Sequence, residues 1–351
     1  METIWFCLVA MMIAVYVVLD GYDLGAGALH LLVARTDGER RAVLASIGPV
    51  WDGNEVWLLA AGGTLYFAFP ALYASSFSGF YLPLMMVLWL LILRGSAIEF
   101  RNHVRSLVWQ PFWDAVFAGS SALLAIFFGA ALGNVVRGVP LDSNGEFFLP
   151  LWTDFRTGAH PGILDWYTVL VGITALLALT MHGALWVALK TEGDLEQRTN
   201  RLVRQVWGPL AVFVVIITVA SFGIQPHLQA SFNQHPWGYI FPAAGLAGLI
   251  GAPVYAARNR AMRAFLSSSL FLAGMLTSVA FGLYPNVLPS NGDSALSLTI
   301  RNAAAAPYGL RIGLAWFIPG MVLTTGYFVY TYRNFTGKIH IDEANDSHHA
   351  A

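Results

Sequence analysis

Charged residues and cysteine are both scarce in this sequence. Asp, Glu, Lys and Arg make up 11% of the 351 residues, whereas hydrophobic residues make up 57%. Soluble globular proteins carry about 25% charged residues, so this composition indicates a membrane protein. The formal net charge is −1 and the basic residues form no dense patch, which argues against nucleic-acid binding. The single cysteine, Cys7, excludes an internal disulfide and a cysteine metal site.

Long uncharged runs divide the chain into membrane-spanning segments. The 38 residues from Val56 to Leu93 contain no Asp, Glu, Lys, Arg or His. A helix needs about 20 residues to cross a bilayer, so this run predicts two spans joined by a turn near Pro70. Applied to the whole chain, the same pattern predicts nine transmembrane helices, at 4–33, 56–73, 77–93, 112–133, 165–189, 207–224, 237–257, 265–283 and 311–332.

The expected fold is therefore an all-α integral membrane protein built of helical bundles. We expect a polytopic transmembrane domain at residues 1–338 and a polar cytoplasmic tail at residues 339–351. Orientation follows from Lys and Arg, which favour the cytoplasmic side of a membrane. With the N-terminus outside, fifteen of the 19 Lys and Arg residues fall on cytoplasmic segments and four on outer segments. This asymmetry predicts an N-out, C-in topology.

Two acidic pairs interrupt apolar sequence. Asp20 and Asp23 lie within the first span, and Asp52 and Glu55 precede the second. Carboxylates in a membrane are costly unless they face a protein interior or a hydrated path. With the predicted topology, these acids step from the cytoplasm towards the bilayer centre, as a proton pathway requires. Structural roles stay open: Asp52 could cap a helix, and Asp20 and Asp23 could be satisfied by backbone groups and hydroxyls of neighbouring helices.

Charged and aromatic neighbours complete the candidate site. Arg94, Glu99 and Arg101 lie at the cytoplasmic end of the third predicted span, where Arg94 could hold one acid ionised while another titrates. The alternative for Arg94 is snorkelling to the lipid headgroups. Trp51 and Trp57 are typical of interfacial anchors, and they could also flank a lipid or a quinone tail.

Histidines decide whether the chain could itself carry haem. Of nine histidines, only His30 and His182 lie within predicted spans. Axial ligation of a haem needs a residue such as histidine or methionine at a suitable depth. A lone membrane histidine is more often a hydrogen-bonding core residue. His30 also falls on one helical stripe with Asp20 and Asp23.

Several segments together resemble a known family. The sequences Leu-Asp-Gly-Tyr-Asp-Leu-Gly-Ala-Gly at 19–27 and Trp-Asp-Gly-Asn-Glu-Val-Trp at 51–57 are similar to the two N-terminal signatures of one protein family. That family is subunit II of bacterial cytochrome bd-type quinol oxidases, including the cyanide-insensitive branch. The resemblance continues at 78–81, at Arg94 with 99–101, and at 281–290.

The resemblance implies a haem-free, non-catalytic subunit II in the bacterial inner membrane. It would assemble with a haem-bearing subunit I into an electrogenic quinol oxidase that reduces oxygen to water. The haems b and d would belong to subunit I, and no metal is expected in this chain. A structural quinone here, contact with lipids and the quinol pool, and a small accessory subunit are compatible with the resemblance. This chain would then support assembly and supply the cytoplasmic proton pathway.

Two other functions stay open from the residues alone. A secondary transporter would also hold acids near the midplane and show an internal repeat, and the chain has a short one, Asp-Gly-x-acid, at 20–23 and 52–55. It lacks the paired Gly/Pro-broken spans in two halves that such transporters show. A self-contained b-type cytochrome would need ligation by a residue such as His182. A reduced-minus-oxidised spectrum of the chain, alone and with its membrane partners, separates the three.

Overall fold

Helices form almost all of the regular structure in the computed structural model, which describes residues 1–158 and 160–339. The helices are α1 (Glu2–Val33), α2 (Asp37–Ala45), α3 (Trp51–Ala68), α4 (Pro70–Gly79), α5 (Tyr81–Phe100), α6 (Trp109–Arg137), α7 (Trp166–Lys190), α8 (Gly193–Ile224), α9 (Pro226–Gln234), η1 (Pro236–Tyr239), α10 (Ile240–Ala257), α11 (Ala261–Leu283), η2 (Ser294–Leu296) and α12 (Pro307–Asn334). Two short strands, β1 (Asn286–Leu288) and β2 (Leu298–Thr299), pair antiparallel. The predicted tail lies outside the described residues except for Ile339.

Each of the nine predicted spans is occupied by a long helix. In the described part of the chain, eight helices are long and apolar enough to cross a membrane: α1, α5, α6, α7, α8, η1 with α10, α11 and α12. The ninth is α3, which begins at Trp51 rather than at the predicted residue 56. It is more polar because its first turns contain Asp52, Asn54 and Glu55. The all-α membrane fold is therefore confirmed.

The turn predicted near Pro70 is itself helical. Pro70 occupies the first turn of α4, where its missing N–H is not needed for helical hydrogen bonding. The helix α4 therefore lies between α3 and α5, where the sequence predicted a tight turn. The short helix α2 likewise lies between the first two predicted spans, where hydropathy predicts no span.

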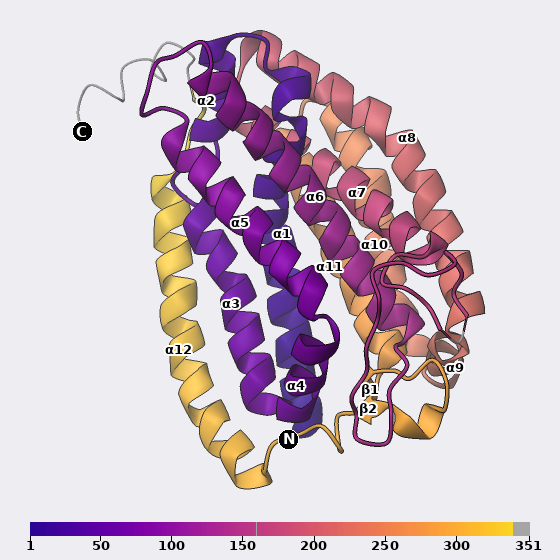
Figure 1. Ribbon diagram of the computed structural model, residues 1–351. Coiled ribbons are helices and arrows are strands. Elements are labelled where there is room, and N and C mark those ends of the chain that lie inside the picture. Colours follow the sequence, from indigo (N-terminus) through magenta and orange to yellow (C-terminus); the bar gives the residue numbers. More distant parts are fainter. Residues whose placement is uncertain (159, 340–351) are drawn as a thin grey trace.

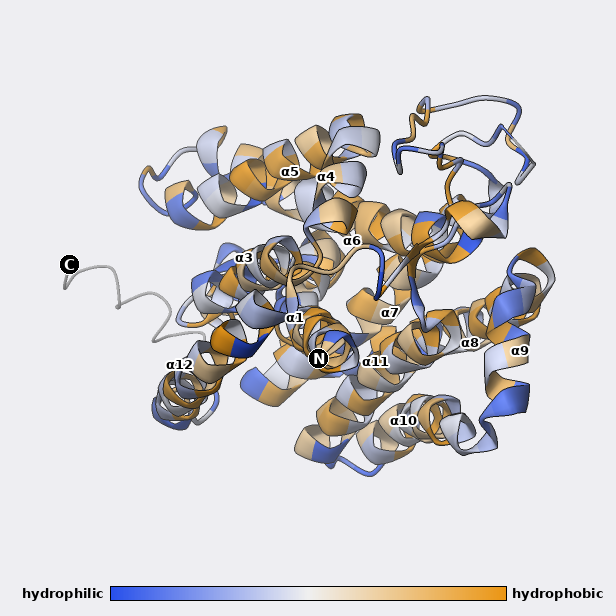
Figure 2. Ribbon diagram, turned by 90° about the horizontal axis from the view of Figure 1, so that it is seen from below, coloured by the Kyte–Doolittle hydropathy of each residue, from blue (hydrophilic) through white to orange (hydrophobic). Residues whose placement is uncertain are grey.

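The long helices run side by side, with α1 at the centre of the arrangement. The N-terminus and the C-terminal end of α12 lie at opposite ends of the molecule (Figure 1), as an odd number of crossings requires. Viewed along the helices, α1 is surrounded by other helices and α12 lies at the edge beside α3 (Figure 2). The helix α1 packs directly against α3, α6, α7 and α11.

The outer end of the molecule carries two irregular connections. One joins α6 to α7, and the other joins α11 to α12 and contains β1 and β2. Arg137 at the end of α6 forms a buried ion pair with Asp165. Asp165 also caps α7, because its Oδ1 accepts hydrogen bonds from the N–H groups of Tyr167 and Thr168, each at 2.8 Å. These bonds hold the first long connection against the outer ends of α6 and α7.

Candidate functional site

Three of the predicted acids meet in a buried group of side chains, which we call the deep cluster. It consists of Asp20, Asp23, Asn54, Glu55 and Arg94. Asp20 and Asp23 come from α1, Asn54 and Glu55 from the first turns of α3, and Arg94 from the last turns of α5. All are buried except Glu55, whose side chain is 23% exposed. The structure thus brings together acids that the sequence placed on separate spans.

Arg94 bridges two of these acids. Its Nη2 atom donates hydrogen bonds to Asp20 Oδ1 at 2.7 Å and to Glu55 Oε2 at 2.8 Å. The guanidinium is 0% exposed in this chain, which argues against snorkelling to the headgroups. A buried cation needs anionic partners to offset the loss of hydration, and Asp20 and Glu55 supply them. Arg94 therefore holds α1, α3 and α5 together at this depth.

Asp23 is held by the amide of Asn54, which two phenols hold in turn; none of the three was identified from the sequence. Asn54 Nδ2 donates to Asp23 Oδ2 at 2.8 Å and to the Tyr22 hydroxyl at 2.6 Å. Tyr332 donates its hydroxyl proton to Asn54 Oδ1 at 2.9 Å and is also hydrogen-bonded to Tyr22. Tyr332 lies on α12, 278 residues from Asn54 in sequence. The last long helix thus contributes to the site.

Several polar atoms of this region have no hydrogen-bond partner among the described residues. They are Asp20 Oδ2, Asp23 Oδ1, Arg94 Nε and Nη1, and the Tyr16 hydroxyl. Buried polar atoms are normally hydrogen-bonded, and a group that mixes free donors and acceptors suits water, which can serve as either. The cluster also has three carboxyl groups for one guanidinium. Because uncompensated buried charge is costly, this excess requires partners beyond Arg94, and water is suited to that role.

The other predicted site residues lie outside the deep cluster. Asp52 is exposed in the first turn of α3, where it makes no hydrogen bond or ion pair with another described residue and caps no helix. Glu99 is exposed near the end of α5 and contributes only its backbone carbonyl, which accepts from His103. Trp57 is buried against Phe328 of α12, with ring centroids 5.6 Å apart.

Trp51 is half-buried at the start of α3. Two largely apolar cavities lie elsewhere on the chain. One, of about 750 Å³, lies mainly between α1 and α11, and the other, of about 590 Å³, lies among α1, α3, α5 and α6. Neither Trp51 nor Trp57 lines either cavity. These tryptophans therefore have no direct contact with either of the two cavities.

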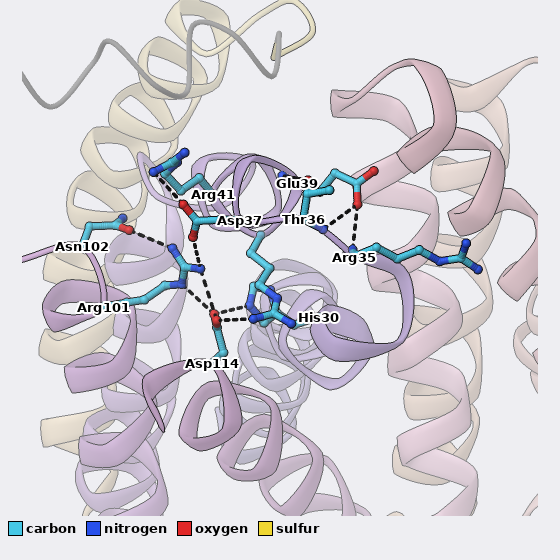
Figure 3. Close-up of polar contacts among 10 residues, drawn as sticks. His30, Arg35, Thr36, Asp37, Glu39, Arg41, Arg101, Asn102 and Asp114 are labelled. Atoms are coloured by element: carbon cyan, nitrogen blue, oxygen red, sulfur yellow. Dashed lines mark hydrogen bonds and ion pairs between the residues drawn. The ribbon is translucent and has the colours of Figure 1, made fainter. Parts of the chain in front are cut away.

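A second charged group lies nearer the cytoplasmic end of α1, and we call it the rim cluster. It consists of His30, Asp37, Arg40, Arg101 and Asp114 (Figure 3). Asp114, on the second turn of α6, is 1% exposed. Its Oδ1 lies 2.6 Å from both His30 Nε2 and Arg101 Nε, and its Oδ2 lies 3.1 Å from Arg40 Nη1.

Arg101 extends the rim cluster outwards. Its Nη2 donates to Asp37 Oδ1 at 2.8 Å, and the Asp37 side chain is 45% exposed. The sequence predicted Arg101 as a charge partner, but Asp114 and His30 as its neighbours were missed. The signal for Asp114 was an acid in the first turns of an apolar span, between Trp109 and Phe117. The rim cluster therefore connects solvent to a buried acid and a buried histidine.

Local hydrogen bonds fix the start of α2 beside the rim cluster. Thr36 and Glu39 form a capping box, in which Thr36 Oγ1 accepts from Glu39 N and Glu39 Oε2 accepts from Thr36 N, both at 3.2 Å. Burial opposes ionisation of Glu39. Hydrogen bonds from the Arg35 backbone, Arg198 and the Thr36 backbone outweigh this effect and lower the pKa of the carboxyl. Glu39 thus stays ionised and keeps Asp37 and Arg40 in position.

His182, the other histidine within a span, has both ring nitrogens occupied. Nδ1 lies 2.7 Å from Ser268 Oγ, and Nε2 lies 2.9 Å from the Val18 carbonyl oxygen. Its ring stacks on Phe265 at 4.8 Å. This is the geometry of a core histidine and leaves no nitrogen for a haem. Within the described residues, no group of three or more His, Cys, Asp or Glu side chains could hold a metal ion.

Both clusters bring titratable side chains together between the helices. In the rim cluster these run from the exposed Asp37 through Arg101 to Asp114 and His30, and in the deep cluster Asp20 and Glu55 share Arg94. Glu55 gives the deep cluster a second, partly exposed side. Proton transfer needs such groups, or water, within hydrogen-bond reach of one another.

Comparison with known proteins shows similarity along the whole chain. Residues 1–335 match the family model described as cytochrome bd terminal oxidase subunit II. The chain is 30% identical to the probable cytochrome oxidase subunit 2 of Haemophilus influenzae, over 99% of this chain and 97% of that protein. It is 30% identical to the cytochrome bd-I ubiquinol oxidase subunit 2 of Escherichia coli, with the same coverage. The solved bd oxidase of Geobacillus thermodenitrificans shares the fold, with a TM-score of 0.71 at 17% identity over 95% of this chain and 98% of that one.

Proposed function

Since the chain belongs to the cytochrome bd terminal oxidase subunit II family, we propose that it delivers cytoplasmic protons to a haem-bearing subunit I that reduces oxygen. The chain is a multi-pass protein of the bacterial inner membrane and a subunit of a quinol oxidase complex. Its own part is non-catalytic: it binds no haem, supports assembly, and holds and moves protons for chemistry that subunit I performs. Family membership also speaks against the transporter alternative.

The deep cluster is the observation that carries this proposal. A structural ion pair would need one acid for Arg94, yet Arg94 contacts both Asp20 and Glu55, and a third buried acid, Asp23, lies one helical turn along α1. Free carboxyl oxygens on Asp20 and Asp23 remain available to water. A group with surplus carboxyls around one fixed cation can gain and lose a proton without breaking the Arg94 bridge.

The proposed route enters on the cytoplasmic side of α3. Asp52, exposed in the first turn, and Glu55, about one helical turn further along α3, form the mouth of this route. From Glu55 the proton passes to Asp20, which shares the Arg94 guanidinium. Asp23 lies one helical turn from Asp20 on α1 and adds a further buried carboxyl to the route. Each step exchanges a proton between carboxyl oxygens or water, and no other bond changes.

Assembly is the second part of the proposal. The helices α8 and α12 are apolar but little buried within the chain. Of the most apolar 18-residue stretch, 6% of the residues are buried in α8 and 0% in α12. Lipids and subunit I would cover such faces, since isolated apolar helices gain packing contacts by association. A structural quinone or lipid, in one of the apolar cavities or beside Trp51 and Trp57, and a small accessory subunit remain predictions.

We expect Asp20→Asn to lower oxygen uptake by the purified complex about tenfold, which corresponds to about 1.4 kcal/mol of barrier. Asparagine keeps the size and a hydrogen bond to Arg94 but cannot bind a proton. Asp52→Asn should have a smaller effect because water reaches that position. The measurement is quinol-driven oxygen uptake with haem content as the assembly control.

Glu99→Gln is the matched control, because Glu99 is an exposed acid on the same side that contacts neither cluster. It should behave as the unmodified complex. Full turnover in Asp20→Asn at full haem content would mean that the deep cluster is structural and that protons reach subunit I by another way.

A further inference from the structure

His30 is the member of the rim cluster that lies on α1, the helix that also carries Asp20 and Asp23 of the deep cluster. It follows Asp23 by seven residues, so it lies about 10 Å further along the helix axis and on nearly the same face. The rim cluster starts at solvent with Asp37 and Arg40, and His30 is its innermost titratable member. Among the side chains described so far, this ring alone both contacts the buried Asp114 and lies on the same helix as Asp23.

The surroundings of His30 differ from those of a purely structural histidine. The ring is buried, Nε2 lies 2.6 Å from Asp114 Oδ1, and Nδ1 has no hydrogen-bond partner among the described residues. The charged groups that face it are Asp114 from α6, Arg101 after α5 and Arg40 from α2. Phe117 packs edge-to-face against the ring, with centroids 5.3 Å apart. His182, by contrast, uses both nitrogens and faces no acid.

We propose that His30 is a second proton relay, which passes protons from the rim cluster at Asp114 to Asp23. This inference rests on the proposed proton-delivery function and adds a second intake to it, beside the mouth at Glu55. Imidazole suits the task because it can accept a proton at one nitrogen and release a different proton from the other. The ring ends neutral in its other tautomer, rotation of the ring restores the first tautomer before the next proton, and no other bond forms or breaks.

The neighbours of His30 support such a cycle. The Asp114 carboxylate stabilises the transient imidazolium, while Arg40 and Arg101 oppose a lasting positive charge on the ring. The free Nδ1 atom leaves one nitrogen available for exchange with water. The remaining distance to Asp23 is too long for a direct hydrogen bond, so the relay requires water between them.

The test uses the purified complex with subunit I and the variants His30→Gln and His30→Ala. Glutamine can hydrogen-bond to Asp114 but cannot carry a proton, so we expect about twofold slower oxygen uptake at full haem content, since the mouth at Glu55 stays open. We also expect a larger ratio of rates in H₂O and D₂O, because proton delivery becomes rate-limiting. Added imidazole should restore part of the lost rate in His30→Ala. If His30 only held helices together, its variants would show neither the isotope effect nor the rescue by imidazole.

His182→Gln is the matched control, since it removes a buried histidine that faces no acid. It should lower complex stability without a change in the isotope ratio. If His30→Gln keeps full turnover and an unchanged isotope ratio while Asp20→Asn is slow, the relay is overturned and the proposed function stands. If Asp20→Asn is also fully active, the proposed function itself fails. An equal isotope effect in His182→Gln would assign the result to loosened packing and overturn the relay.

Discussion

Replacing Arg94 with leucine is expected to leave little assembled oxidase in the membrane. Arg94 is fully buried and is the cation that contacts Asp20 and Glu55 among the described residues. Removal of one partner from a buried ion pair strands the other charge and costs about 3–5 kcal/mol. That loss is a large fraction of the stability of a typical folded protein, about 5–15 kcal/mol. It falls on the contact that joins α1, α3 and α5.

The measurement is the haem difference spectrum per amount of membrane protein, together with the thermal stability of the complex in detergent. The triple variant Arg94→Leu, Asp20→Asn, Glu55→Gln removes the stranded charges and should restore assembly. It should not restore oxygen uptake, because the two acids that carry the proposed route from the mouth, Glu55 and Asp20, can no longer bind a proton. Normal assembly of Arg94→Leu alone would show that the acids are neutral without their cation and that the ion pair is not what holds the helices.

Arg94→Lys should give an intermediate result. An ammonium keeps the positive charge but lacks the planar guanidinium, so it cannot hold Asp20 and Glu55 from one rigid group. We expect partial assembly and reduced turnover of whatever assembles. This separates the need for charge from the need for geometry at the deep cluster.

The helices could be predicted from the sequence because the bilayer imposes their length and polarity. Nine apolar segments of about 20 residues have few other structures available to them in a membrane. Hydropathy predicts the start of the second span at Val56, five residues after α3 begins at Trp51, because Asp52 and Glu55 resemble a boundary with water. In the structure Glu55 is turned towards Arg94, and that contact depends on the position of α5, which hydropathy does not reveal.

The acids of the site could be found from the sequence, but their partners could not. Asp20 and Asp23 stand out because charge is rare in their span. Asn54 and Tyr332 do not stand out, since amides and phenols are common near membrane surfaces. Their role follows only from the packing of α12 beside α3, which brings Tyr332 to Asn54 across 278 residues. Tertiary packing, rather than local pattern, therefore decides which polar residues complete the deep cluster.

Gly183→Ala is expected to disturb the same site from its other side. The helices α1 and α7 approach so closely at Gly25 and Gly183 that an added Cβ at Gly183 would lie 2.3 Å from the Gly25 carbonyl carbon and 2.4 Å from the Ala26 nitrogen. These are backbone atoms, so no side chain can rotate away and the helices must separate. Overpacking of this kind costs about 1–3 kcal/mol, and helices in lipid depend on close contact between small residues.

Separation of α1 from α7 would displace the helix that carries Asp20, Asp23 and His30. We therefore expect Gly183→Ala to lower both the amount of assembled complex and the turnover per haem, measured by difference spectra and oxygen uptake. Gly119→Ala is the control, because Gly119 is exposed within α6 and an added Cβ there meets nothing within 4 Å. Its stability should stay equal or rise slightly, as alanine favours helix. If Gly183→Ala retains full assembly and turnover, α1 can shift without loss of proton delivery, and the deep cluster does not require the close contact with α7.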